Sequence, residues 1–132
     1  MATVSAGPMS PRAVVEAFFK DWETSFVEAF DRWLDPDCLW QNSGFPDARG
    51  KAAIQEILDA YLAVSDKPYG RVEMISIATS GNKVLTERID HLWGDHDNHH
   101  SIRIMGCLEV EGGRITRYAD YTDPRPFIPG GH

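Results

Sequence analysis

Cysteine is scarce in this sequence. The two cysteines, Cys38 and Cys107, are too few and too far apart for the disulfide framework of a small secreted domain, and we interpret both as small core residues. There is also no apolar run of roughly 18 residues, the length that a bilayer-spanning helix needs. Residues 1–12 lack the basic and apolar segments of a secretory signal. From these absences we expect a cytoplasmic protein that is neither secreted nor embedded in a membrane.

Positive charge is scarce as well. Thirteen lysines and arginines stand against 20 aspartates and glutamates, which gives a net charge of -7. Neutralising the phosphates of DNA or RNA needs a basic surface, so we expect neither nucleic acid nor an anionic membrane as a partner. The chain also lacks a glycine-rich phosphate loop, a nucleophile elbow and the ligand spacing of a zinc site. We therefore expect no cofactor and no metal.

One histidine cluster needs a separate judgement. His96, His99 and His100 lie close in sequence to Asp95 and Asp97. These residue types bind metals, but the segment also has the composition of a short polar turn between two strands. We favour the solvated turn.

Two stretches have the apolar spacing of three and four residues that is typical of amphipathic helices, residues 11–33 and 54–62. Ser10 and Pro11 are the residue types preferred at an N-cap and at the first helical position. The longer stretch is expected to break into two helices near residues 24–25. Both helical stripes should face the core.

Strands account for most of the remaining chain. Turn residues separate five stretches that we predict to be strands: 38–42, 71–79, 83–93, 100–110 and 114–123. Helices first, then a short strand, a helix and four antiparallel strands is an α+β layout. We predict a curved antiparallel sheet wrapped around the N-terminal helices, forming a cone with an interior pocket. We expect the shape of the pocket to depend on residues whose orientations the sequence alone does not fix, such as Leu62, Met74, Trp93, Met105, Leu108 and Phe127.

The pattern indicates one domain over residues 1–132, with irregular tails at 1–10 and 124–132. No internal repeat, low-complexity segment or linker divides the chain.

Polar residues interrupt the predicted strands at three places. Arg88 and Asp90 alternate along one strand and therefore share one face, either as a surface ion pair or as a charged pair inside the cone. Asp120 stands within a strand, where aspartate is disfavoured, so it either protects an edge strand or serves a site. Asn42 is either a turn residue or part of the same site.

Four motifs in order resemble the limonene-epoxide-hydrolase family. They are W-Q-N at 40–42, E-R-I-D at 87–90, I-M-G-C-L at 104–108 and Y-A-D-Y-T-D at 118–123. The family pattern is Y-Q-N, E-R-V-D, I-L-G-V-F and W-R-D-Y-F-D, and the resemblance covers residues 10–127. It implies the curved-sheet cone that is also found in nuclear transport factor 2, ketosteroid isomerase and SnoaL-like polyketide cyclases.

The resemblance also implies roles and partners. Asp90 matches the general acid that protonates the epoxide oxygen, and Asp120 matches the general base that deprotonates the attacking water. Arg88 matches the arginine that bridges the two carboxylates, and Asn42 matches a residue that holds the water. The implied reaction opens a small hydrophobic epoxide to a vicinal diol in one step, without a covalent intermediate, and the implied assembly is a homodimer.

The sequence departs from the family pattern at Trp40, where the family has its water-holding tyrosine. An indole donates one hydrogen bond and accepts none. This keeps open an epoxide-opening cyclase, which needs no bound water. A SnoaL-like or ketosteroid-isomerase-like enzyme is a further alternative, although the nearest acids to the required base position are Asp37 and Asp47. A non-catalytic, ligand-binding dimeric module is the last.

Overall fold

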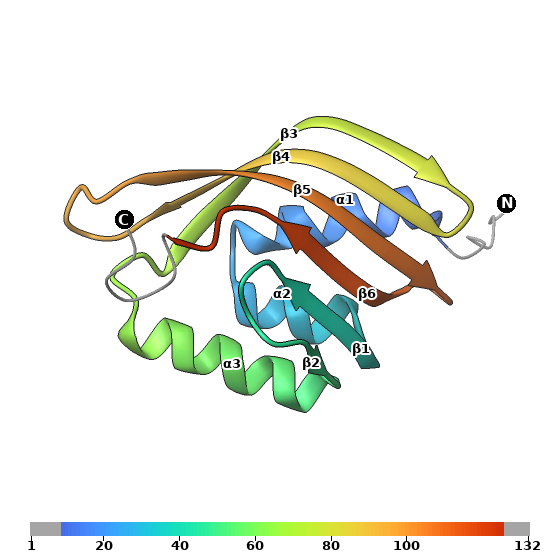
Figure 1. The fold of residues 1–132 in the computed structure, drawn as a ribbon, viewed down its shortest axis with the longest axis horizontal. Helices are drawn as coiled ribbons and strands as arrows, with labels where there is room; N and C mark the ends of the chain where they lie inside the picture. Colours follow the sequence, from blue (N-terminus) through green and yellow to red (C-terminus); the bar gives the residue numbers. More distant parts are fainter. Residues whose placement is uncertain (1–8, 126–132) are drawn as a thin grey trace, which may run out of the picture.

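Three helices and six strands make up residues 9–125, the part of the chain that the computed structural model describes (Figure 1). Most of the two predicted tails, and with them Phe127, lies outside the described residues. In chain order the elements are α1 (Pro11–Trp22), α2 (Phe26–Trp33), β1 (Leu34–Asn42), β2 (Ala48–Arg49), α3 (Lys51–Val64), β3 (Tyr69–Ser80), β4 (Lys83–Trp93), β5 (His100–Glu111) and β6 (Arg114–Tyr121).

The predicted helices are confirmed, including the break in the first one. Ser10 caps α1, and its hydroxyl accepts a hydrogen bond from the backbone N–H of Ala13 at 3.1 Å. Ser25 caps α2 in the same way, through the N–H of Glu28 at 3.2 Å. These local caps fix where each helix starts because they satisfy N–H groups that have no partner within the helix.

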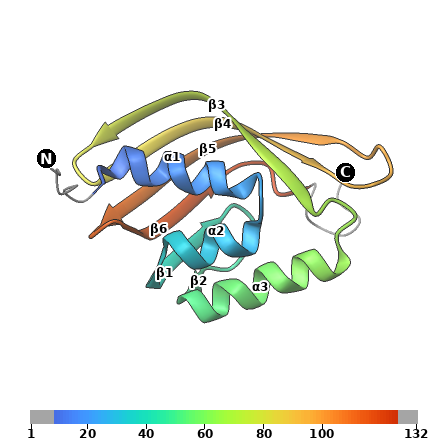
Figure 2. The same cartoon turned by 180° about the vertical axis from the view of Figure 1, so that it is seen from behind.

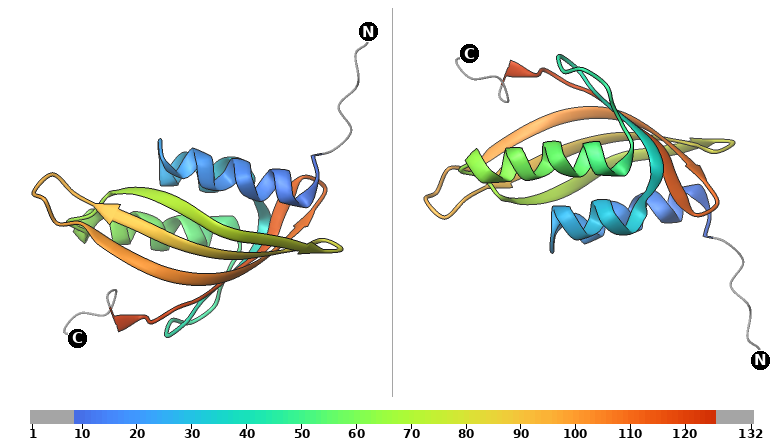
Figure 3. Two further views of the ribbon diagram at one scale, coloured as in Figure 1. Left: turned by 90° about the horizontal axis from the view of Figure 1, so that it is seen from above. Right: turned by 90° about the horizontal axis from the view of Figure 1, so that it is seen from below.

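The sheet has the strand order β2-β1-β6-β5-β4-β3. The four strands from β3 to β6 are antiparallel, as predicted, whereas β1 runs parallel to β6 and makes the sheet mixed. The sheet is strongly curved, and the helices lie on its concave side (Figure 3). Helix α1 packs against the inner face of β3 to β6 (Figure 2). This is the predicted α+β cone.

The segment around Pro36 differs from the prediction. The predicted strand begins at residue 38, whereas β1 already begins at Leu34. Its pairing with β6 is interrupted by a register shift between Leu34 and Leu39, so the missing N–H of Pro36 falls where the ladder is irregular. The following loop also contains β2, whose two residues pair with β1 and were not predicted.

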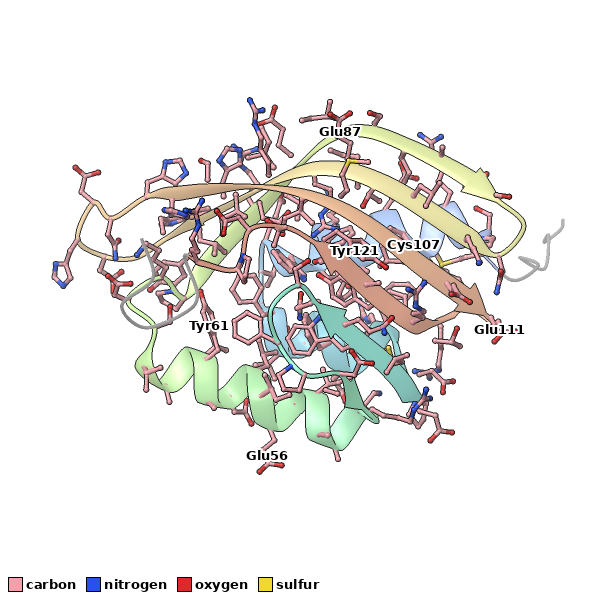
Figure 4. All side chains as sticks on the ribbon, in the orientation of Figure 1. Glu56, Tyr61, Glu87, Cys107, Glu111 and Tyr121 are labelled. Atoms are coloured by element: carbon pink, nitrogen blue, oxygen red, sulfur yellow. The ribbon has the colours of Figure 1, made fainter. Side chains whose placement is uncertain are left out.

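Alternation along β4 separates two faces of the sheet. Val84, Thr86, Arg88, Asp90 and Leu92 are buried on the inner face. Residues between them point outward, among them Glu87, which projects from the outer surface (Figure 4). The sequence left open which of these two sets faces the core, and the structure places the set with Arg88 and Asp90 inside.

Candidate active site

The guanidinium of Arg88 joins two carboxylates inside the cone. Its Nε and Nη2 donate to the two oxygens of Asp90, each at 3.1 Å, and its Nη1 and Nη2 donate to the two oxygens of Asp120, each at 2.9 Å. Nη1 also donates to the hydroxyl of Thr86 at 3.2 Å. The three charged residues come from β4 and β6, and each is at most 6% exposed. The five N–H groups of the Arg88 guanidinium lie in one plane, and here each of them donates to an oxygen atom of a neighbouring side chain.

A glycine makes room for this network. Gly106 of β5 lies between Thr86 and Asp120 in the sheet register. A Cβ at this position would lie 2.6 Å from Nη1 of Arg88 and 2.8 Å from Oδ1 of Asp120. The signal was present in the sequence as a glycine in the middle of an apolar strand, which often marks a close approach. We had assigned Gly106 no role.

The ring of Phe19 on α1 lies 4.4 Å from the guanidinium carbon of Arg88 and covers it from the helix side. A cation over an aromatic face is attracted by the ring quadrupole. The same ring excludes water from the cluster, which strengthens the interactions between its charges. Sequence reasoning identified Phe19 as core and missed this second function.

Burial changes the pKa values of the charged residues in this cluster. It raises the pKa of Asp90 above its usual value, against the opposing effect of Arg88. Burial works against the charged guanidinium as well, but Asp120 and then Asp90 outweigh it, so the pKa of Arg88 is raised well above its ordinary range. Arg88 therefore stays positive, and burial favours the protonated form of Asp90.

A cavity of about 600 Å³ opens beside the two carboxylates. Asp90, Asp120 and Asn42 contribute polar groups to its wall, while most of the lining is apolar and includes Trp22, Phe26, Phe30, Leu58, Ile102 and Ile104. Tyr61 of α3 points toward the sheet and closes the cavity from the helix side, whereas Glu56 of the same helix points away (Figure 4). Such a space suits a small apolar ligand that carries one reactive polar group.

Strand β1 brings the third motif to the same place. Asn42 pairs with Asp120 and Trp40 pairs with Tyr118 in the parallel register between β1 and β6. All four residues line the cavity. The structure therefore brings together every residue that the sequence singled out: Trp40, Asn42, Arg88, Asp90 and Asp120.

Among the described residues, those expected to shape the pocket do not line it. Leu62, Met74, Trp93, Met105 and Leu108 do not line the cavity, and Phe127 lies outside the described residues. Met105 and Trp93 are on the outer face of the sheet, Leu108 is in the core, and Leu62 and Met74 pack against the core. The helical stripes supply part of the actual lining, including Trp22, Phe26 and Phe30, although the sequence predicts the stripes as core alone.

The other sequence candidates lie elsewhere. Residues 94–99 form a turn, as predicted, and within residues 9–125 no three His, Cys, Asp or Glu side chains gather as metal ligands would. Cys38 is buried, and burial, with the nearby Asp35, raises its pKa to about 12. Cys107 is not a core residue, because it lies half-buried on the outer face, where Arg117 approaches its sulfur. No helix among the described residues is long and apolar enough to cross a membrane.

Comparisons with known proteins identify related sequences and folds. The model of the SnoaL-like domain family matches residues 15–118. The epoxide hydrolase EphG of Mycobacterium tuberculosis is 28% identical over 125 residues, which covers 88% of this chain and 75% of that protein.

Solved structures give the same picture. The structure of an LEH-like epoxide hydrolase from M. tuberculosis superposes with a TM-score of 0.75 at 27% identity, covering 96% of this chain and 89% of the other. A putative SnoaL-like polyketide cyclase from Jannaschia sp. CCS1 has a TM-score of 0.71 at 10% identity, with coverages of 98% and 97%. The second likeness concerns the fold alone.

Proposed function

The chain belongs to the SnoaL-like domain family, and we propose that within this family it is an epoxide hydrolase that works by general acid and general base catalysis. One observation carries the proposal: a single buried arginine is forked between two buried carboxylates at the wall of an apolar cavity. A binding module that only needed an apolar pocket would gain nothing from the cost of burying three charges.

Asp90 is the proposed acid. Its raised pKa favours the protonated form, which can donate to the epoxide oxygen as the C–O bond breaks. Asp120 is the proposed base and takes one proton from the water whose oxygen forms the new C–O bond. Asn42 lies next to Asp120 in the register and is the proposed holder of that water.

Arg88 keeps the charge of the cluster balanced during the reaction. One turnover leaves Asp90 ionised and Asp120 protonated, so the total charge of the cluster is unchanged. The guanidinium contacts both carboxylates throughout and stabilises whichever one is negative. A single proton transfer from Asp120 to Asp90 then restores the starting state. No covalent intermediate, metal or cofactor is part of this scheme.

The substrate class follows from the cavity. Most of its lining is apolar, and the two carboxylates of the cluster lie in its wall, so we propose a small hydrophobic epoxide that places its ring oxygen against Asp90.

The test uses limonene oxide, cyclohexene oxide and styrene oxide in ¹⁸O-labelled water. The expected product is a diol with one labelled oxygen, and Asp90→Asn or Asp120→Asn is expected to lower kcat by about 10²- to 10⁴-fold. Asp47→Asn is the matched control, because Asp47 is an exposed carboxylate on the rim of the same cavity, outside the Arg88 network. Inactivity on every epoxide, unaltered by these substitutions, would favour the binding module instead.

An epoxide-opening cyclase is the second candidate, and Trp40 is the observation that favours it. The indole cannot accept a proton from water, whereas a hydroxyl within the substrate could attack the epoxide without a bound water. Epoxides that carry a free hydroxyl distinguish the two: a cyclic ether without ¹⁸O indicates the cyclase, and a labelled diol indicates the hydrolase.

We also propose that two copies associate through the outer face of the sheet. Ile75, Leu85, Met105 and Tyr121 expose about half of their surface there, and Tyr121 lies beside Cys107 on that face (Figure 4). Burying these exposed apolar side chains against a second copy would remove them from water. Sedimentation of the wild type and of Met105→Glu tests this: the wild type should be a dimer and the variant should dissociate.

A further inference from the structure

Two aromatic rings stand side by side next to Asp120. Trp40 of β1 and Tyr118 of β6 are register partners, and their rings stack with centroids 6.1 Å apart at an interplanar angle of 24°. Both residues line the cavity. Their polar groups differ in one respect that matters for chemistry, because an indole only donates a hydrogen bond while a phenol both donates and accepts.

The indole is poorly suited to hold an attacking water. Nε1 of Trp40 is buried and has no hydrogen-bond partner among the described residues. An indole that donates to the water oxygen uses one of its two lone pairs but accepts neither of its protons. A water that attacks carbon needs acceptors for these protons, and Trp40 can assist neither Asp120 nor Asn42 in this.

The phenol is better placed. Tyr118 is 1% exposed, and its ring is fixed by edge contacts with Phe18 and Phe30. Burial raises the pKa of Tyr118 well above its usual value, and the charge of Asp120 raises it further. The hydroxyl thus keeps its proton and lies beside the proposed base.

In the first and last of the four motifs, tyrosine and tryptophan have exchanged places relative to the family pattern. The family pattern has tyrosine in its first motif and tryptophan at the start of its last, whereas this chain has Trp40 and Tyr118 in those positions. The register between β1 and β6 makes these two positions neighbours, so a hydroxyl lost from one strand is regained on the next.

Building on the proposed hydrolysis, we propose that Tyr118 is a catalytic residue that holds the attacking water. Its hydroxyl donates to Asp120, and its oxygen accepts a hydrogen bond from the water, whose other proton passes to Asp120. The water oxygen then forms the bond to carbon while Asp90 protonates the leaving oxygen. Tyr118 keeps its own proton, and Trp40 contributes shape to the cavity rather than a hydrogen bond to the water.

The test compares Tyr118→Phe with Trp40→Phe. Tyr118→Phe removes one oxygen and keeps the ring, and it is expected to lower kcat by about 10- to 100-fold, the value of a hydrogen bond to a charged group, with KM changed little. Trp40→Phe changes the shape of the cavity but removes no hydrogen bond, so it is expected to lower kcat by less than Tyr118→Phe does. Thermal unfolding of both variants checks that the fold persists.

Two further readouts separate a chemical role from a structural one. With an epoxide that carries a free hydroxyl, Tyr118→Phe should yield less ¹⁸O-labelled diol and more cyclic ether. The exchange Trp40→Tyr/Tyr118→Trp should recover activity relative to Tyr118→Trp alone.

The outcomes distinguish the two proposals. A wild-type enzyme that opens epoxides and depends on Asp90, but is unaffected by Tyr118→Phe or is impaired by Trp40→Phe instead, overturns the role of Tyr118 alone. A wild-type protein that opens no epoxide overturns the proposed function, and the role of Tyr118 with it.

Discussion

The two faces of the sheet carry similar charged pairs in very different surroundings. On the inner face, Arg88 and its two carboxylates are almost completely buried. On the outer face, Arg117 and Glu109 form a pair at 3.1 Å whose side chains are about one quarter exposed. The same residue types therefore give a carboxyl group with a raised pKa on one face and a water-screened ion pair on the other. Burial, rather than the residue types, makes the difference.

The largest expected effect comes from removing one arginine from each face of the sheet. Arg88→Met leaves two buried carboxylates without their counter-ion and should lower the free energy of unfolding by about 3–5 kcal/mol at pH 7. Arg117→Met removes a partly exposed pair and should cost at most about 1 kcal/mol. Urea denaturation of both variants measures the difference. Similar losses would mean that water reaches Arg88 as easily as it reaches Arg117.

The next effect concerns the space around the inner cluster. Gly106→Ala forces a Cβ against the guanidinium and the Asp120 carboxylate, and overpacking of this kind typically costs about 1–3 kcal/mol. Cys107→Ala, at the following residue on the outer face, should change stability by less than about 0.5 kcal/mol. Thermal unfolding gives both values. A Gly106→Ala variant as stable as Cys107→Ala would show that the cluster adjusts without loss.

Local signals explain what the sequence predicted well. Ser10 and Ser25 cap their helices with side chains three residues from the N–H groups they bind, and the bounds of β4 follow from turns on either side. Such features depend on neighbours in the chain, so a single sequence contains them.

Long-range features explain what the sequence could not predict. Both faces of β4 mix polar and apolar residues, so alternation alone did not say that Arg88 faces the core. The role of Gly106 depends on two neighbouring strands, and the stacking of Trp40 on Tyr118 depends on a parallel pairing that the chain order did not reveal. The motif resemblance supplied the residues of the site, but the cavity lining needed the packing of helices on the sheet.

A smaller effect is expected in how the free energy of unfolding depends on pH, because Asp90 is buried on the inner face. The pKa of Asp90 is raised in the folded protein, so the stability that its protonated form contributes is complete below the unfolded value of about 3.9 and is lost as pH rises through the folded pKa. Asp90→Asn stays neutral throughout. Its free energy of unfolding should therefore gain on the wild type by at most about 1.4 kcal/mol for each pH unit between the unfolded and the folded pKa of Asp90.

Denaturant titrations at several pH values follow this gain, with Asp47→Asn as the control that should track the wild type. The same titration limits activity, because the proposed acid no longer donates once it is ionised. A constant difference between Asp90→Asn and the wild type at every pH would mean that folding does not alter the proton affinity of Asp90.

The smallest expected effect lies in the hydrogen-bonded chain on the outer face. The ring of His91 lies 2.8 Å from the hydroxyl of Ser101 and 2.9 Å from the carboxylate of Glu73. Like the inner cluster, this is a carboxylate held by a nitrogen-bearing side chain. Glu73 is about half exposed, so water and salt compete for it, and Glu73→Gln should cost less than about 1 kcal/mol, with a smaller cost in high salt. A loss well above this, insensitive to salt, would mean that the outer face is desolvated in solution. In that case the two faces would differ less than one isolated chain suggests, because a second copy covers the outer one.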